Sequence, residues 1–113
     1  MLEEMFYMQE QFDQKAYDKA KLNGEDVSTE SHINKRVIAL YSEMGEFTDE
    51  LAYFWKFWKA KRHLKPVRVK EELVDIVHFL ISLCITFGIS ADDIYMEYKK
   101  KNKENLRRTT NGY

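Results

Sequence analysis

An apolar stripe with alternating three- and four-residue spacing, within residues 33–58, constrains the fold of this chain more than any other feature. This spacing follows the 3.6-residue turn of an α-helix, so it predicts one long helix with a single buried face. We expect the helix to begin among residues 28–31, whose hydroxyls can cap it, and to reach about Lys61. The stripe consists of Ile33, Val37, Leu40, Met44, Phe47, Leu51, Phe54 and Trp58.

Three further helices follow from the same kind of pattern. Mixed three- and four-residue spacing predicts a first helix over about residues 2–22. A helix over about residues 69–87 should follow the loop that Pro66 closes, and Gly88 should stop it. Ser90 offers a cap for a last helix that reaches about Arg107.

The composition agrees with a helical protein. Its 113 residues are enough for one domain, and they include one proline and four glycines, which favours helices over a loop-rich design. We therefore predict a single all-α domain over residues 1–113, an antiparallel bundle of about four helices that dimerises. Residues 109–113 should form an irregular tail.

Charge and hydropathy exclude several functional classes. The formal net charge of −1 lacks the basic field of non-specific nucleic-acid binders, so we expect no nucleic-acid partner. The longest apolar run is too short to span a bilayer, and the acidic N-terminus does not resemble a signal peptide. The single cysteine, Cys84, can form no intrachain disulfide. Together these features predict a soluble, cytoplasmic protein.

Two carboxylate pairs are the strongest chemical signal. Glu43 and Glu46 are three residues apart on the helix that carries the stripe, and Glu72 and Asp75 are three apart on the next one. Residues three apart share a helix face about 5–6 Å from each other, so two packed helices could converge four carboxylates. Repulsion would destabilise that cluster unless protons or a cation neutralised it, and oxygen ligands favour Mg²⁺. The spacing therefore predicts metal-assisted phosphate chemistry.

Each pair could also be a solvated acidic face. Asp75 fits that interpretation least, because it starts a strongly apolar run, and a buried carboxylate needs a partner. Glu72 has the i, i+3 spacing to Asp75, whereas Glu71 should face solvent. We interpret His78 as a core residue rather than a metal ligand, since the histidine spacing matches no zinc motif.

Two other patterns each allow two interpretations. Residues 53–58 carry aromatic side chains on every side of the predicted helix. They could line a dimer interface, or they could form a stacking wall for a planar base. On the last helix, Tyr98, Lys101 or Asn102, Asn105 and Arg108 share one face. Donors of this kind suit polyphosphate oxygens, although a lysine-rich helix end is often solvated surface.

The order of these motifs resembles a known family. Glu43-x-x-Glu46, Glu72-x-x-Asp75 and the run from Tyr98 to Gly112-Tyr113 are similar to the dimeric, all-α dUTP pyrophosphatases, within the MazG-like nucleotide pyrophosphohydrolases. The resemblance covers nearly the whole chain. It implies hydrolysis of dUTP to dUMP and pyrophosphate with Mg²⁺ by a homodimer.

The resemblance also implies roles for individual residues. The metal ligands would be Glu43, Glu46, Glu72 and Asp75, and Glu43 or Glu46 would also activate the attacking water. The phosphates would bind Lys101, Asn102, Asn105 and Arg108. The base would bind Gln9, Trp55 and Trp58.

The chain departs from the family pattern in two ways. It is shorter, with only about residues 88–90 between the last two helices, and Thr109 stands where a glutamine is expected after Arg108. The alternatives are a broader MazG-like dNTP pyrophosphatase and a non-enzymatic helical interaction module.

Overall fold

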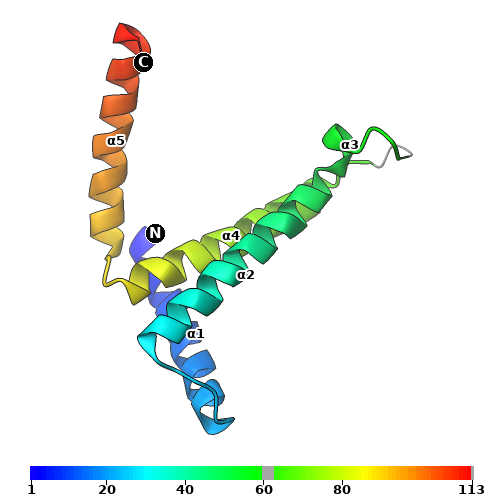
Figure 1. The fold of residues 1–113 in the computed structure, drawn as a ribbon. Coiled ribbons are helices and arrows are strands. Elements are labelled where there is room, and N and C mark those ends of the chain that lie inside the picture. The colour runs from blue at the N-terminus through cyan, green and yellow to red at the C-terminus, as the bar shows by residue number, and fades with distance from the viewer. Residues whose placement is uncertain (60–62, 113) are drawn as a thin grey trace.

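A computed structural model describes residues 1–59 and 63–112, and those ranges contain helices and no strand. The helices are α1 (Leu2–Leu22), α2 (Thr29–Glu50), α3 (Ala52–Trp55), α4 (Pro66–Thr86) and α5 (Ala91–Asn111). The predicted all-α class is therefore confirmed (Figure 1).

Serine caps begin two of the long helices, as the sequence predicted. The Ser28 hydroxyl accepts a hydrogen bond from the Ser31 backbone N–H at 3.3 Å and starts α2. Ser90 and Asp93 exchange side-chain and backbone hydrogen bonds in a capping box that starts α5. Pro66 belongs to α4 rather than to the preceding loop, because the first helical position needs no N–H donor.

Two predicted helix ends were wrong. The stripe helix stops at Glu50, and the Trp55 indole N–H just beyond it donates to the Thr48 carbonyl at 2.9 Å. The expected end at Lys61 lies outside the described residues. The tail was expected to be irregular, but α5 continues to Asn111, and the Thr109 hydroxyl donates to the Asn105 carbonyl within the helix.

Helices α2 and α4 lie side by side and antiparallel, and they form the most extensive contact of the chain (Figure 1). Arg36, early in α2, contacts Ser82, late in α4, while Glu50 at the end of α2 contacts Arg68 at the start of α4. Helix α1 packs across one end of α4 and also contacts the start of α5. The buried core lies where α1, α4 and α5 meet, around Phe6, Ile81 and Ala91.

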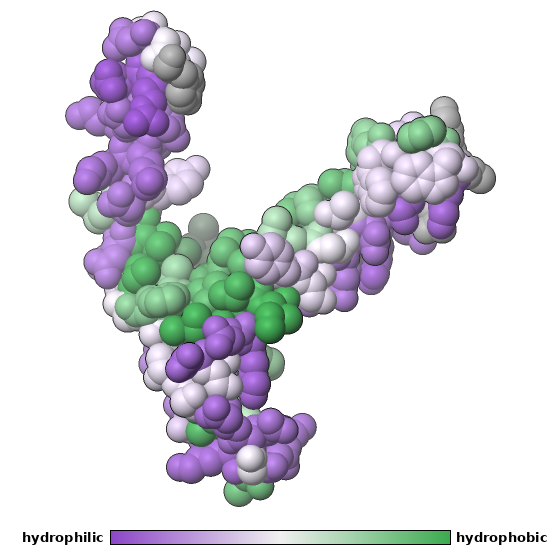
Figure 2. All heavy atoms as spheres, in the orientation of Figure 1, coloured by the Kyte–Doolittle hydropathy of each residue, from purple (hydrophilic) through white to green (hydrophobic). Residues whose placement is uncertain are grey.

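Much apolar surface stays exposed in the single chain. The Cα radius of gyration is 17.9 Å, against roughly 13 Å for a compact chain of this length. Figure 2 shows hydrophobic side chains gathered around the junction of α1, α4 and α5. The strongly apolar run of α4 is not fully covered, because Leu73, Val74, Val77 and Leu80 are exposed and α1 and α2 cover only part of the helix.

Among the described residues, no single helix is long and apolar enough to cross a bilayer. Helices α4 and α5 meet that criterion only as a pair, and the chain bends by 109° between them.

Candidate metal centre

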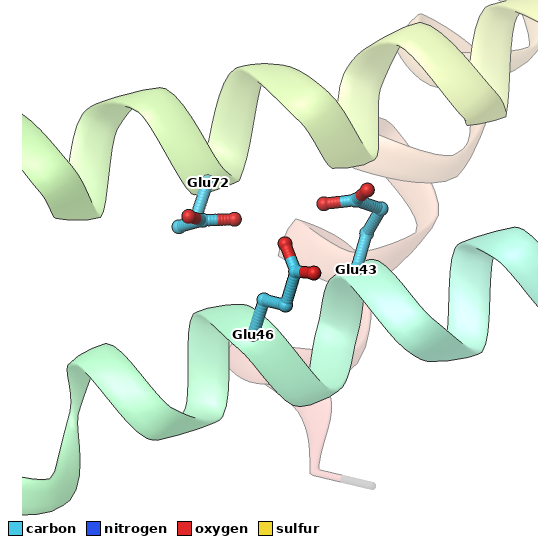
Figure 3. A group of neighbouring side chains, drawn as sticks. All are labelled: Glu43, Glu46 and Glu72. Carbon is cyan, nitrogen blue, oxygen red and sulfur yellow. The ribbon is translucent and has the colours of Figure 1, made fainter.

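Three glutamates converge between α2 and α4. Glu43 and Glu46 point from adjacent turns of α2 toward Glu72 on the facing helix (Figure 3). One carboxylate oxygen from each lies within 4.8 Å of the others. The antiparallel packing of the two helices produces this arrangement, because it sets the i, i+3 pair of α2 opposite the first turns of α4.

The electrostatics of this cluster favour a positive ligand. Burial raises the pKa of Glu72, and the neighbouring charges of Glu46 and Asp75 raise it further. Burial also raises the pKa of Glu43, with added repulsion from the same two carboxylates. Among the described residues, the buried Oε2 atoms of Glu43 and Glu72 have no hydrogen-bond partner. A cation would neutralise the repulsion and occupy both oxygens, and an all-oxygen donor set fits a hard ion such as Mg²⁺.

Asp75 lies beside this cluster but not within it. Its side chain is exposed, so the expectation that its apolar neighbours would bury it was wrong. The reason is that the face of α4 that carries Val74 has no helix against it in the described chain. Asp75 still raises the pKa of both Glu43 and Glu72 through its charge, which places it at the edge of the site.

Arg68 is a neighbour of the site that the sequence interpretation missed. Its guanidinium contacts Glu72 Oε1 at 3.5 Å, Glu50 Oε1 at 3.4 Å and Glu71 Oε2 at 3.3 Å. Glu71 is exposed, as predicted. The i, i+4 spacing from Arg68 to Glu72 is the sequence signal that could have shown this contact.

The predicted base-binding residues lie on opposite sides of the glutamates. Gln9 is buried at the α1 end of the α2–α4 pair, where its Oε1 lies 2.6 Å from Nδ1 of His78. Trp55 and Trp58 stand beyond Glu50 at the other end, exposed, with ring centroids 5.9 Å apart. His78, which we interpreted as a core residue, is exposed.

The predicted phosphate-binding face is distant from the glutamates within one chain. Lys101, Asn102, Asn105 and Arg108 are all exposed on α5, which projects away from the α2–α4 pair (Figure 1). Arg108 Nε lies 3.3 Å from Glu104 Oε1 on the same helix. The described chain therefore presents a carboxylate site and a basic helix in separate places.

A comparison with known families matches residues 1–91 to the family described as dUTPase. The chain belongs to the dUTPase family. The match confirms the resemblance that the motifs suggested, and it includes all three converging glutamates. It ends at the first residue of α5, so the dUTPase-family match does not extend over the basic face of that helix.

Curated relatives come from bacteriophages. A dCTP pyrophosphatase of Enterobacteria phage T4 is 32% identical over 91 residues, covering 70% of this chain and 53% of the relative. A dCTP pyrophosphatase of Enterobacteria phage LZ5 is 33% identical over 89 residues, covering 66% and 52%. A DNA replication protein of phage T4 is 30% identical over 84 residues, covering 64% and 21%. The chain thus spans about half the length of the dCTP pyrophosphatases it matches. No solved structure matches it significantly.

Proposed function

We propose that this protein hydrolyses dUTP to dUMP and pyrophosphate with Mg²⁺ as cofactor. The observation that carries the proposal is the pair of buried, unpartnered carboxylate oxygens on Glu43 and Glu72, beside Glu46, in a chain of the dUTPase family. Such oxygens are costly to bury unless a cation accompanies them.

The proposed reaction is attack of a water oxygen on the α-phosphorus. The bond from that phosphorus to the oxygen bridging to the β-phosphate breaks, pyrophosphate leaves, and a proton of the water passes to a carboxylate. Glu43 or Glu46 would accept it as the general base. Mg²⁺ held by Glu43, Glu46, Glu72 and Asp75 would supply positive charge against the polyphosphate.

A homodimer would bring together the groups that one chain leaves apart. We propose that Lys101, Asn102, Asn105 and Arg108 hold the phosphates of a site whose carboxylates belong to the second subunit. Likewise, Gln9 would bind the edge of the base, while Trp55 and Trp58 would pack against its face. The exposed apolar face of α4 supports a partner of this kind, since a helix apolar nearly all round is normally covered.

A second substrate class has its own support. Two relatives are named dCTP pyrophosphatases, which favours dCTP, or a broader set of deoxynucleoside triphosphates, as the alternative substrate. The non-enzymatic interaction module has less support, because solvated acids would not leave two buried oxygens without partners.

The test is a pyrophosphate-release assay with Mg²⁺ against dUTP, dCTP, dATP, dGTP and dTTP. We expect the highest kcat/KM with dUTP, and Glu72→Gln should lower it by about 100-fold or more, since mutating even an outer-shell partner of a metal ligand typically costs about 10–100-fold. Glu71→Gln is the matched control, because Glu71 is adjacent but exposed and should keep activity. A higher kcat/KM for dCTP would overturn the substrate, and an equal loss in both variants would overturn the site.

A further inference from the structure

A chain of polar side chains ties α1 to α2 and α4 at the α1 end of the α2–α4 pair. Asp13 Oδ1 accepts from Gln9 Nε2 at 2.9 Å and lies 3.3 Å from Arg36 Nη2. Asp13 Oδ2 accepts from the Ser82 hydroxyl at 2.7 Å, and Arg36 Nε donates to that same hydroxyl. Gln9 and Ser82 are only 6% and 1% exposed, so water does not compete for these groups.

These contacts determine which end of the Gln9 amide faces which neighbour. Arg36 can only donate, and an ionised carboxylate can only accept, so the Gln9 atom beside Asp13 Oδ1 must be the NH₂ group. The oxygen of the amide then faces His78 Nδ1 at 2.6 Å, and this ring nitrogen must carry the hydrogen. A neutral His78 is therefore held as the Nδ1–H tautomer.

We propose that Asp13 is a positioning residue that sets base selectivity by preventing the Gln9 amide from turning over. The inference rests on the proposed function, in which Gln9 binds the edge of the base. After its contacts to Asp13 and His78, Gln9 retains one N–H and one lone pair for a ligand.

The orientation of the Gln9 amide matters because uracil and cytosine present opposite patterns of hydrogen-bond donors and acceptors. Uracil offers an N3–H donor next to the O4 acceptor, whereas cytosine offers an N3 acceptor next to an N4 amino donor. An amide that could rotate by 180° would satisfy either base equally well. An amide held by Asp13 satisfies one base and opposes the other in the same pose, which is a discrimination of about 5- to 150-fold for a bidentate contact.

Four variants separate this role from a structural one. Asp13→Ala frees the amide, and the ratio of kcat/KM between dUTP and dCTP should move toward unity by at least about tenfold. Asp13→Asn should preserve the ratio, because the positive guanidinium of Arg36, 3.3 Å from Oδ1, favours the Asn oxygen at that position, facing Gln9. Asp18→Ala is the matched control: Asp18 accepts from Gln14 with the same i, i+4 geometry on the exposed face of α1. If Asp13→Ala does not fold, Asp13→Asn with Arg36→Met removes the charge pair together and lets the Asn turn.

A second measurement does not depend on activity. The ¹⁵N shifts of the His78 ring at about pH 8, where imidazoles are mostly neutral, should report the Nδ1–H tautomer in the wild type. They should report a mixture in Asp13→Ala. If no nucleotide is cleaved, the proposed function fails while the shifts still decide whether Asp13 holds the amide. An unchanged ratio, or an unchanged His78 tautomer, in Asp13→Ala would overturn the inference.

Discussion

Mg²⁺ should raise the melting temperature of this protein, and Glu72→Gln should remove that rise. The carboxylate oxygens of Glu43, Glu46 and Glu72 within 4.8 Å form the site only when α2 and α4 are packed, so the ion should bind the folded chain and not the unfolded one. At 100 times the Kd such an ion stabilises the folded state by about 2.7 kcal/mol. For a chain of this size the melting temperature should rise by roughly 10 °C.

In the metal-free protein, removing one negative charge from this cluster should raise the melting temperature. The pKa values of Glu43 and Glu72 are raised above the ordinary value of 4.5, so the folded state binds protons more tightly than the unfolded state. Stability is then greatest below about pH 4.5 for these two groups, and it falls as the pH rises through their raised pKa values. In EDTA at pH 7.5, Glu72→Gln should therefore melt at a higher temperature than the wild type.

Circular dichroism melts at pH 7.5, in EDTA and over a series of Mg²⁺ concentrations, test both effects. The variants are Glu72→Gln and the exposed neighbour Glu71→Gln, which should keep the wild-type response to Mg²⁺. An equal Mg²⁺ shift in the wild type and Glu72→Gln would refute the assignment of these carboxylates. So would a lower melting temperature of Glu72→Gln in EDTA.

Three other predictions concern pH, assembly and the start of α5. In EDTA, lowering the pH from 7 to 5 should raise the stability of the wild type more than that of a Glu43→Gln/Glu72→Gln double variant, measured by urea unfolding. Mixing inactive Glu72→Gln chains with inactive Lys101→Ala/Arg108→Ala chains should restore about a quarter of wild-type activity. Half of the mixed dimers would contain one chain of each kind, and each of these would hold one complete site out of two. No recovery of activity would contradict a site shared between subunits. Ser90→Ala should cost about 1 kcal/mol in urea unfolding by removing the cap of α5, while Ser42→Ala, on the exposed middle of α2, should change little.

Local signals in the sequence located most helices. Ser28 and Ser90 cap helices because their hydroxyls satisfy backbone N–H groups within three residues, an interaction that depends only on neighbouring positions. The end of α2 was missed because the apolar spacing continues past Glu50, although the helix ends there and the Trp55 indole N–H donates to the Thr48 carbonyl. No periodic pattern carries information about a contact of that kind.

The candidate site was partly predictable for the same reason. The i, i+3 spacing places Glu43 and Glu46 on one face, and Glu72 meets them because α2 and α4 pack side by side. The burial of Asp75 was predicted wrongly, since burial depends on which helix covers that face of α4. Asp13 gave no sequence signal, because its partners Arg36 and Ser82 come from two other helices.

The all-α class, the capped helix starts and the carboxylate spacing can be read from the sequence, because each follows from interactions within one or two helical turns. The convergence of three glutamates with two oxygens unpartnered in the described residues, the exposure of Asp75 and the separation of α5 from the site all require the folded chain. Those features depend on how helices pack, and the packing of α4 against its neighbours is set by contacts between residues far apart in the chain. The orientation of the Gln9 amide belongs to the same class, since it requires Asp13, Arg36 and His78 to meet from three helices.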